Sequence, residues 1–276
     1  MPFPNRIACS SSVRCGFDLP DAVTALQNGG FQQIDLLVID GWAHVNTSDL
    51  AADFEQTVAG VDALLGPAGL KPVAMNTGVG PQLWERTDAH NETRQRETDA
   101  LLRFMKHYGV TVAALQPKSQ DNSRPWETVL EDCVATLTEQ IEAGQAKGVT
   151  FCLELHVNSP FESEAQARRV LEVMPDLPVV YDPTHFVMQG MDIRDTTWIM
   201  KNAGHAHLRD AAKGKLQAPF GEGEVDFDWV LGTLRDTGYE GLFSIEYLGG
   251  KKAEFDIVDS ARRLHDKIAE YFPPTS

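Results

Sequence analysis

Two kinds of hydrophobic pattern alternate along the chain. Short apolar segments rich in β-branched residues are each followed by a longer segment in which apolar residues recur every three or four positions, as on one face of a helix. The spacing from one short segment to the next, about 26 to 40 residues, suits a strand, a helix and two loops. The eight predicted strands are 6–10, 33–38, 72–77, 111–117, 150–156, 178–183, 205–210 and 242–247.

The segments between the strands carry residues that begin and end helices. Glycine closes several of them, as expected where the chain leaves a helix. Pro125 favours the first turn of one helix, and Ser163 is a typical N-terminal cap with Glu164 and Gln166 close behind it. The predicted helices are 19–30, 48–65, 92–109, 126–148, 164–174 and 227–238.

Eight strand–helix units without an obvious linker predict one closed (β/α)8 TIM barrel of the α/β class, in a single domain over residues 1–276. A doubly wound open sheet is the alternative for such a pattern. No G-x-G-x-x-G turn follows the first predicted strand, so the usual nucleotide signature of that fold is missing. A chain of 276 residues that is 42% hydrophobic has an ordinary length for one barrel.

The charge of the chain narrows the range of partners. A net charge of -16 at pH 7 is spread over the sequence without a cluster of Lys and Arg among aromatic residues, which argues against nucleic acid. The first residues lack a basic start before an apolar stretch, and no run of about 18 uncharged apolar residues occurs, which argues against export and membrane insertion. The four cysteines form no C-x-x-C pair. We therefore expect a cytoplasmic protein.

Polar residues follow apolar runs in four consecutive predicted strands. Glu154 lies near the end of the fifth strand, Asp182 near the end of the sixth, His205 and His207 in the seventh, and Glu246 near the end of the eighth. In a (β/α)8 barrel the C-terminal ends of the strands carry the chemistry. Neighbouring strands lie about 4.8 Å apart and alternate side chains share a face, so inward residues of similar height can converge on one ion.

Three carboxylates and one imidazole offer mostly hard oxygen donors. Such a set suits a single divalent cation, with manganese first and magnesium, cobalt or zinc as alternatives, and it lacks the thiolates of a structural zinc site. Each residue alone also has an ordinary reading as a helix N-cap, half of an ion pair or a buried core histidine. The joint pattern favours a metal site. We prefer His207 as the ligand because it lies nearer the end of its strand, and assign His205 to packing or to support of the ligands.

Motifs of the C-terminal half resemble the sugar phosphate isomerase/epimerase group of the xylose isomerase-like TIM barrel superfamily, which includes tagatose epimerases, hydroxypyruvate isomerases and inosose dehydratases. The N-terminal half contributes only the repeat pattern. The motifs are LELH (153–156), YDPTHF (181–186), HAHLRD (205–210), FGEGEVDFDWVLGTL (220–234) and YEGLFSIEY (239–247). The resemblance implies one xylose isomerase-like domain with a metal held by Glu154, Asp182, His207 and Glu246.

The same resemblance implies contacts to the substrate. His185 would face it, because the histidine of a D-x-x-H motif commonly hydrogen-bonds substrate oxygens in this group; its ordinary reading is a loop histidine beside a proline. His156 is a candidate for a substrate contact or for support of the ligands. Arg209 is another candidate, with an ion pair at the barrel rim as the alternative. Phe186, next to His185, is a candidate wall on which a sugar ring stacks.

The ligand set predicts chemistry beside a carbonyl group. A divalent ion bound to the carbonyl and hydroxyl oxygens would stabilise an enediolate, and Glu154 and Glu246 would remove and return the proton. The expected activity is isomerisation or epimerisation of a small sugar, ketose or polyol-derived ketone. A dehydratase of the inosose dehydratase type is the alternative on the same site, because an enediolate can also expel a β-hydroxyl group.

Two other classes fit the sequence less well. An apurinic endonuclease of the same superfamily would need more histidine ligands, and DNA conflicts with the net charge of -16. A non-catalytic sugar-binding barrel would be expected to lose a ligand, and none of the four is missing. No basic cradle for a phosphate is obvious, which favours a non-phosphorylated substrate, although Lys118, Arg124 and Lys213 lie in loops that could converge. The exact sugar and the oligomeric state stay open, a homo-oligomer included.

Overall fold

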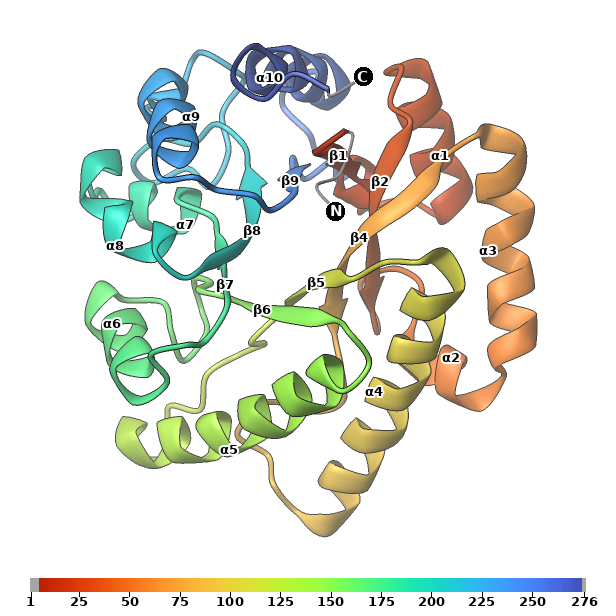
Figure 1. The fold of residues 1–276 in the computed structure, drawn as a ribbon, viewed down its shortest axis with the longest axis vertical. Helices are drawn as coiled ribbons and strands as arrows, with labels where there is room; N and C mark the ends of the chain where they lie inside the picture. Colours follow the sequence, from red (N-terminus) through yellow and green to blue (C-terminus); the bar gives the residue numbers. More distant parts are fainter. Residues whose placement is uncertain (1–4, 275–276) are drawn as a thin grey trace.

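The computed structural model describes residues 5–274. Its central strands are β1 (Ile7–Ser10), β2 (Gln33–Ile39), β4 (Lys71–Gly78), β5 (Val112–Leu115), β6 (Thr150–Glu154), β7 (Val179–Tyr181), β8 (Ala203–Leu208) and β9 (Phe243–Ile245). They pair in parallel in the order β1, β9, β8, β7, β6, β5, β4 and β2, and β2 pairs again with β1, which closes the ring. Figure 1 shows the helices arranged around these strands. The prediction of a single-domain (β/α)8 TIM barrel is confirmed.

Each of the eight predicted strands overlaps one observed strand. The predicted segments run past the C-terminal ends of the observed strands β5, β6, β7, β8 and β9. One further strand, β3 (Ala43–His44), was not expected from the sequence. It pairs with β2 in the antiparallel sense, outside the barrel ring.

The long helices are α1 (Leu19–Asn28), α2 (Thr47–Ala52), α3 (Phe54–Ala68), α4 (Asp88–Tyr108), α5 (Trp126–Gln145), α6 (Glu164–Val173), α9 (Phe227–Asp236) and α10 (Ile257–Tyr271). Short helical turns are η1 (Ser11–Arg14), α7 (Thr184–Val187), η2 (Ile193–Thr196) and α8 (Thr197–Met200). Pro125 precedes α5 as predicted, and Ser163 forms a capping box with Gln166 at the start of α6. The prediction of one helix over 48–65 is wrong, because the chain leaves the helical conformation at Asp53. The Asp53 side chain accepts the backbone N–H of Gln56 and so caps the N-terminus of α3.

The strands pack on both faces, toward the barrel interior and toward the surrounding helices. Small residues fill the barrel interior, among them Ala8, Ala74, Ala114 and Cys152, and larger apolar residues fill the space between strands and helices. Because alternate strand positions share a face, the residues two positions beyond these small ones also face inward. The strand register agrees, as it pairs Asn76 with Ala114, Glu154 with Val180 and His207 with Ser244. The inward face therefore becomes polar toward the C-terminal ends of the strands.

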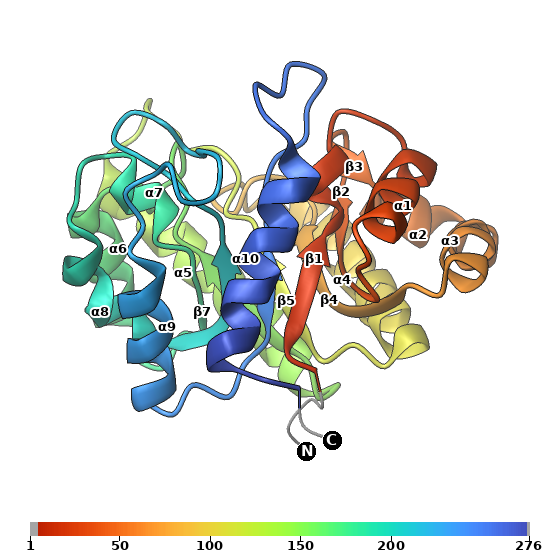
Figure 2. The same ribbon diagram turned by 90° about the horizontal axis from the view of Figure 1, so that it is seen from above.

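Figure 2 shows the barrel from its side. The strand β1 begins and α10 ends at one end of the barrel, while the segment between β9 and α10 rises above the opposite end, where the parallel strands finish. Among the described helices, none is both long and apolar enough to cross a membrane.

Candidate metal centre

Four acidic and histidine side chains converge at the C-terminal ends of the last four strands. Glu154 ends β6, Asp182 directly follows β7, His207 lies in β8, and Glu246 directly follows β9. Each offers one ligand atom, and these atoms all lie within 4.8 Å of one another. None of the four residues is more than 3% exposed. The structure thus brings together the four residues that the strand-end pattern selected.

Two basic side chains lie among the carboxylates. Arg209 is buried and donates hydrogen bonds to Glu246 and, over 3.0 Å, to Asp182 Oδ2, so it does not lie at the barrel rim. The Nε2 atom of His185 lies 3.1 Å from Glu154 Oε1 and 3.3 Å from Asp182 Oδ2. The buried acids are therefore each paired with a donor, as burial of charge requires.

These contacts shift the acid–base properties of the cluster. Burial alone would raise the pKa of the Glu154 carboxyl, but His185 and neighbouring histidines lower this pKa to about 2. Burial would likewise raise the pKa of Asp182, and Arg209 and His185 hold it well below its ordinary value. The opposite balance applies to His185, since burial would lower its pKa while Asp182 and Glu154 raise it to about 9. Both carboxylates are ionised at neutral pH, as metal ligands must be.

The donor set fits a divalent cation. His207 Nδ1 lies 3.3 Å from Glu246 Oε2 and 4.0 Å from Glu154 Oε1, and it has no hydrogen-bond partner among the described residues. A buried nitrogen that lacks a partner and faces carboxylate oxygens is the arrangement expected of a ligand. Oxygen donors with one imidazole match the preferences of manganese, magnesium, cobalt or zinc better than those of a soft metal.

The N-terminal half of the barrel supplies neutral donors to this cluster. Asn76, in β4, donates from Nδ2 to Glu246 Oε1 over 2.6 Å, and Gln116, just after β5, donates to Glu154 Oε2. Neither amide was predicted from the sequence, because neither belongs to the motifs or to the metal-binding residue types at the strand ends. The available signal was a polar residue on the inward face at the end of each strand.

A further acid lies beneath the cluster and was also missed. Asp35, in β2, is fully buried, and its Oδ2 lies 3.3 Å from His207 Nε2 and 3.6 Å from His205 Nε2. Burial would raise the pKa of this carboxyl, yet the two histidines hold it below its ordinary value. His205 is also buried, and its Nδ1 faces the Leu242 carbonyl at 3.1 Å. It lies outside the group of four, and forms with Asp35 and His207 another group of side chains able to hold a metal, so its supporting role stays a prediction.

A cavity of about 360 Å³ opens above the cluster. His156 and Arg209, two of the predicted substrate contacts, line it together with Glu154 and Glu246. His185 lies deeper, with its ring centroid 4.1 Å from that of His156. The complete lining is Ile39, Trp42, Gln116, Lys118, Glu154, His156, Arg209, Leu216, Glu246 and Leu248.

Phe186 does not reach this cavity. It is 1% exposed, and its ring packs edge-on against Trp198 with 5.8 Å between centroids. The predicted stacking of a sugar on Phe186 gains no support from this position, because the ring belongs to the layer between strands and helices. The aromatic residue that lines the cavity is Trp42, which is 44% exposed. Its place in the loop after β2 could not be read from strand patterns.

The glycine-rich motif after β8 is organised by Asp210. The carboxylate of Asp210 accepts the backbone N–H groups of Gly221, Gly223 and Val225. A side chain at position 223 is excluded, because its Cβ would lie 2.1 Å from Asp210 Oδ1. The glutamates of the motif, Glu222 and Glu224, are exposed to solvent.

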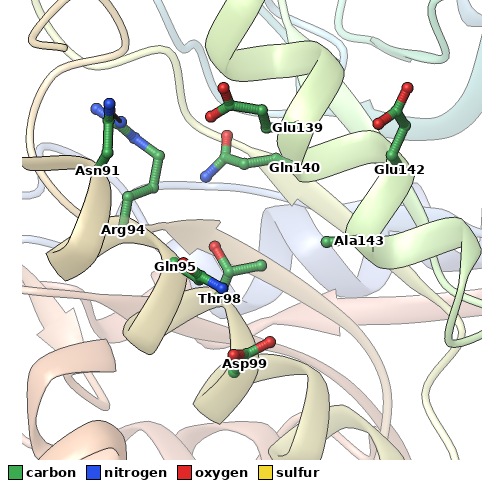
Figure 3. A pocket seen from close by; sticks show the side chains of 9 residues that line it. All are labelled: Asn91, Arg94, Gln95, Thr98, Asp99, Glu139, Gln140, Glu142 and Ala143. Atoms are coloured by element: carbon green, nitrogen blue, oxygen red, sulfur yellow. Dashed lines mark hydrogen bonds between the residues drawn. The ribbon is translucent and has the colours of Figure 1, made fainter. Parts of the chain in front are cut away.

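A second cavity, of about 480 Å³, lies between α4 and α5 on the outer wall of the barrel (Figure 3). Arg94 lines it, is 2% exposed and donates to the side chain of Asn91 and to the carbonyls of Gln82 and Glu85. These bonds tie the loop before α4 to the helix itself. None of the metal-capable groups found within residues 5–274 lies here, so we place the candidate site at the strand ends.

Comparison with known families agrees with this architecture. A sequence profile of the family described as xylose isomerase-like TIM barrel matches residues 23–267. The chain therefore belongs to that family. It is also 22% identical over 214 residues to an uncharacterized protein of Methanocaldococcus jannaschii, a match that covers 75% of this chain and 71% of the relative.

Solved structures with the same fold include enzymes of two kinds. A D-psicose 3-epimerase from Clostridium cellulolyticum, determined with D-tagatose, superposes with a TM-score of 0.69 at 14% identity. The alignment covers 96% of this chain and 99% of the epimerase chain. The probable 3-DHS dehydratase AsbF of Bacillus anthracis gives a TM-score of 0.68 at 17% identity, with 94% of this chain and 98% of the AsbF chain aligned. A xylose isomerase-like TIM barrel protein from Mycobacterium smegmatis, in complex with magnesium, gives a TM-score of 0.70 at 13% identity, with 91% of this chain and 88% of that protein's chain aligned. At these identities the likeness establishes the shared fold.

Proposed function

We propose that this protein is a divalent-metal-dependent isomerase or epimerase of a small sugar, ketose or polyol-derived ketone. The observation that carries the proposal is the convergence of Glu154, Asp182, His207 and Glu246 within 4.8 Å, beneath a cavity of about 360 Å³. The fold shared with a sugar epimerase supports the same conclusion.

These four residues would hold one ion, manganese by preference, with magnesium, cobalt or zinc as alternatives. When bound, the ion supplies positive charge that polarises a substrate carbonyl and favours loss of the neighbouring proton. The proposal draws support from the donor set and from the similarly folded protein in complex with magnesium.

Glu154 and Glu246 would move the proton. They come from β6 and β9, with β7 and β8 between them, and both line the cavity, so they can approach a bound substrate from different sides. An amide donor fixes one oxygen of each carboxylate, Gln116 on Glu154 and Asn76 on Glu246. Carboxylates fixed in this way can remove a proton from one carbon and return it on the other face or at the next carbon.

His156, His185 and Arg209 would bind the substrate oxygens. His156 and Arg209 already line the cavity, and His185 lies against both His156 and Glu154. The exposed ring of Trp42 offers a face for the C–H groups of a sugar.

We propose that the substrate carries no phosphate group. Of the three basic residues that the sequence left open, only Lys118 lines the cavity. Arg124 is engaged by Asp121 and Asp132, and Lys213 is exposed elsewhere. Arg209 also lines the cavity, but its guanidinium is paired with Asp182 and Glu246. Lys118 by itself is fewer than the convergent donors with which proteins bind a phosphate.

Solvent exchange tests the reaction directly. Protein reloaded with Mn²⁺ is incubated in D₂O with a panel of ketoses, keto-inositols and 3-keto-sugars, and products are read by NMR and mass spectrometry. We expect a rearranged sugar with deuterium on the carbon next to the carbonyl, because a proton held by a glutamate exchanges with solvent. Product without deuterium would indicate hydride transfer and would remove the proton-carrying roles of Glu154 and Glu246.

The same experiment separates the alternative activity. A dehydratase would give the exchange together with loss of water, and the fold shared with a probable 3-DHS dehydratase is the observation in its favour. An endonuclease or a non-catalytic sugar-binding barrel would leave every carbon-bound hydrogen in place.

A further inference from the structure

We propose that Asp35 positions His207, fixing Nδ1 of this imidazole as the nitrogen that binds the metal. The inference rests on the metal centre proposed above and adds a residue from the opposite half of the barrel. Asp35 does not line the cavity and is not one of the four ligands, so its action on the centre passes through His207.

The two ring nitrogens of His207 face different groups. Nδ1 points to the carboxylates of the centre, 3.3 Å from Glu246 Oε2, whereas Nε2 lies 3.3 Å from Asp35 Oδ2. Neither nitrogen of His207 and neither oxygen of Asp35 has a hydrogen-bond partner of good geometry within residues 5–274. The 3.3 Å between His207 Nε2 and Asp35 Oδ2 is within reach of an N–H bond, and the other ring nitrogen near this oxygen is His205 Nε2, at 3.6 Å.

His205 is the competing candidate, and its bonds rule it out. Its Nδ1 lies 3.1 Å from the Leu242 carbonyl, which can only accept, so the ring proton resides on Nδ1. The bare Nε2 then accepts the hydroxyl of Ser244 at 3.2 Å and has no hydrogen left for Asp35. His207 is therefore the partner of Asp35.

A carboxylate behind a metal-binding imidazole has a known physical effect. It fixes the tautomer and the ring orientation and makes the other nitrogen a better donor, and its loss typically costs about 10- to 100-fold in metal affinity. A fully buried carboxylate is also costly unless it is paired, so its position under His207 needs such a partner.

The same three residues invite a different reading, in which Asp35, His205 and His207 hold a second ion. That ion would need His207 Nε2 as a ligand while Nδ1 serves the first ion, which requires a fully deprotonated ring. The positioning role needs only the neutral ring, and it predicts one ion for each chain.

Metal titration of the apo protein tests the proposal. We expect Asp35→Asn to weaken Mn²⁺ binding about 10- to 100-fold, measured by calorimetry. The matched control is Glu97→Gln, which alters another buried carboxylate, 5% exposed, that accepts from Thr47 and Gly80 outside the centre. The control should lower thermal stability and leave the Mn²⁺ affinity unchanged.

A second measurement uses the wild-type protein, so it tests the proposal even if Asp35→Asn does not fold. Long-range ¹H–¹⁵N spectra of the Zn²⁺-loaded, ¹⁵N-histidine-labelled protein should show His207 protonated at Nε2 and bound through Nδ1. Binding through Nε2, two ions per chain, or unchanged affinity in Asp35→Asn would overturn the positioning role while leaving the metal centre intact. A wild-type protein that binds no divalent ion would overturn the proposed function as well.

Discussion

The strands β6 to β9 of the C-terminal half carry all four candidate ligands, whereas β2, β4 and β5 of the N-terminal half contribute Asp35, Asn76 and Gln116. The first set offers the ligand atoms and faces the cavity or the centre. The second set contacts the first, with amides on the two glutamates and a carboxylate behind the histidine. One half of the barrel thus supplies the groups for chemistry, and the other fixes their orientation.

The division has a physical reason. A cation site needs several negative donors close together, and such donors repel one another unless neutral or positive groups hold them. The amides of Asn76 and Gln116 each satisfy one oxygen of a glutamate without adding charge. Variants in the two halves should therefore fail in different ways.

The largest effect is expected for Glu246→Gln in the C-terminal half. The substitution keeps the volume and removes a basic oxygen, so kcat should fall by about 10³-fold while the fold persists. Activity, circular dichroism and bound metal are measured together. Glu222→Gln, in an exposed glutamate of the loop after β8, is the control and should be fully active. Near-normal turnover in Glu246→Gln would end the two-glutamate scheme.

The charged half should also make the metal-free protein sensitive to pH. The pKa of His185 rises from 6.5 to about 9 in the folded protein through Asp182 and Glu154, against the effect of burial. A raised pKa stabilises the fold below the unfolded value, so this contribution is complete below pH 6.5 and is lost as the pH rises through 9. The full contribution is about 3 kcal/mol for such a shift.

Denaturant unfolding of EDTA-treated protein at a series of pH values measures this loss. The difference between wild type and His185→Gln isolates the His185 contribution from that of His207, whose pKa is also raised by its carboxylate neighbours against burial. We expect the wild type to lose its advantage over the variant between pH 6.5 and 9. Parallel curves for the two proteins would mean that His185 carries no proton in the metal-free cluster.

The two histidines of β8, His205 and His207, should differ in how much each contributes to metal affinity. His207→Ala removes a candidate ligand and should lower Mn²⁺ affinity by about 100-fold or more, the upper end of what loss of a supporting group costs. His205→Ala removes only a ring that bonds to Leu242 and Ser244, so its effect should be smaller. Metal content after dialysis at a fixed Mn²⁺ concentration compares them. The reverse order would exchange the roles of the two residues.

The same contrast explains what could be predicted from the sequence. Strand and helix alternation gave the barrel, and residue type at strand ends gave Glu154, Asp182, His207 and Glu246, because both are local properties of the chain. Asp35 lies within β2 and meets His207 across the barrel, so only the closed ring and its register reveal the contact. Phe186 shows the converse limit, since adjacency to His185 in sequence does not decide which way a ring points on a short helix.

The smallest effect is expected in the N-terminal half, for Asn76→Ala. Asn76 only orients Glu246, which keeps its contact with Arg209, so we expect about a tenfold fall in kcat, equal to about 1.4 kcal/mol in activation free energy. Thr77→Val is the matched control on the same strand, where the hydroxyl donates to the Ala114 carbonyl away from the centre. It should lower stability and leave kcat unchanged. A loss in Asn76→Ala as large as that in Glu246→Gln would mean that the amide takes part in the chemistry, and the division between the two halves would no longer hold.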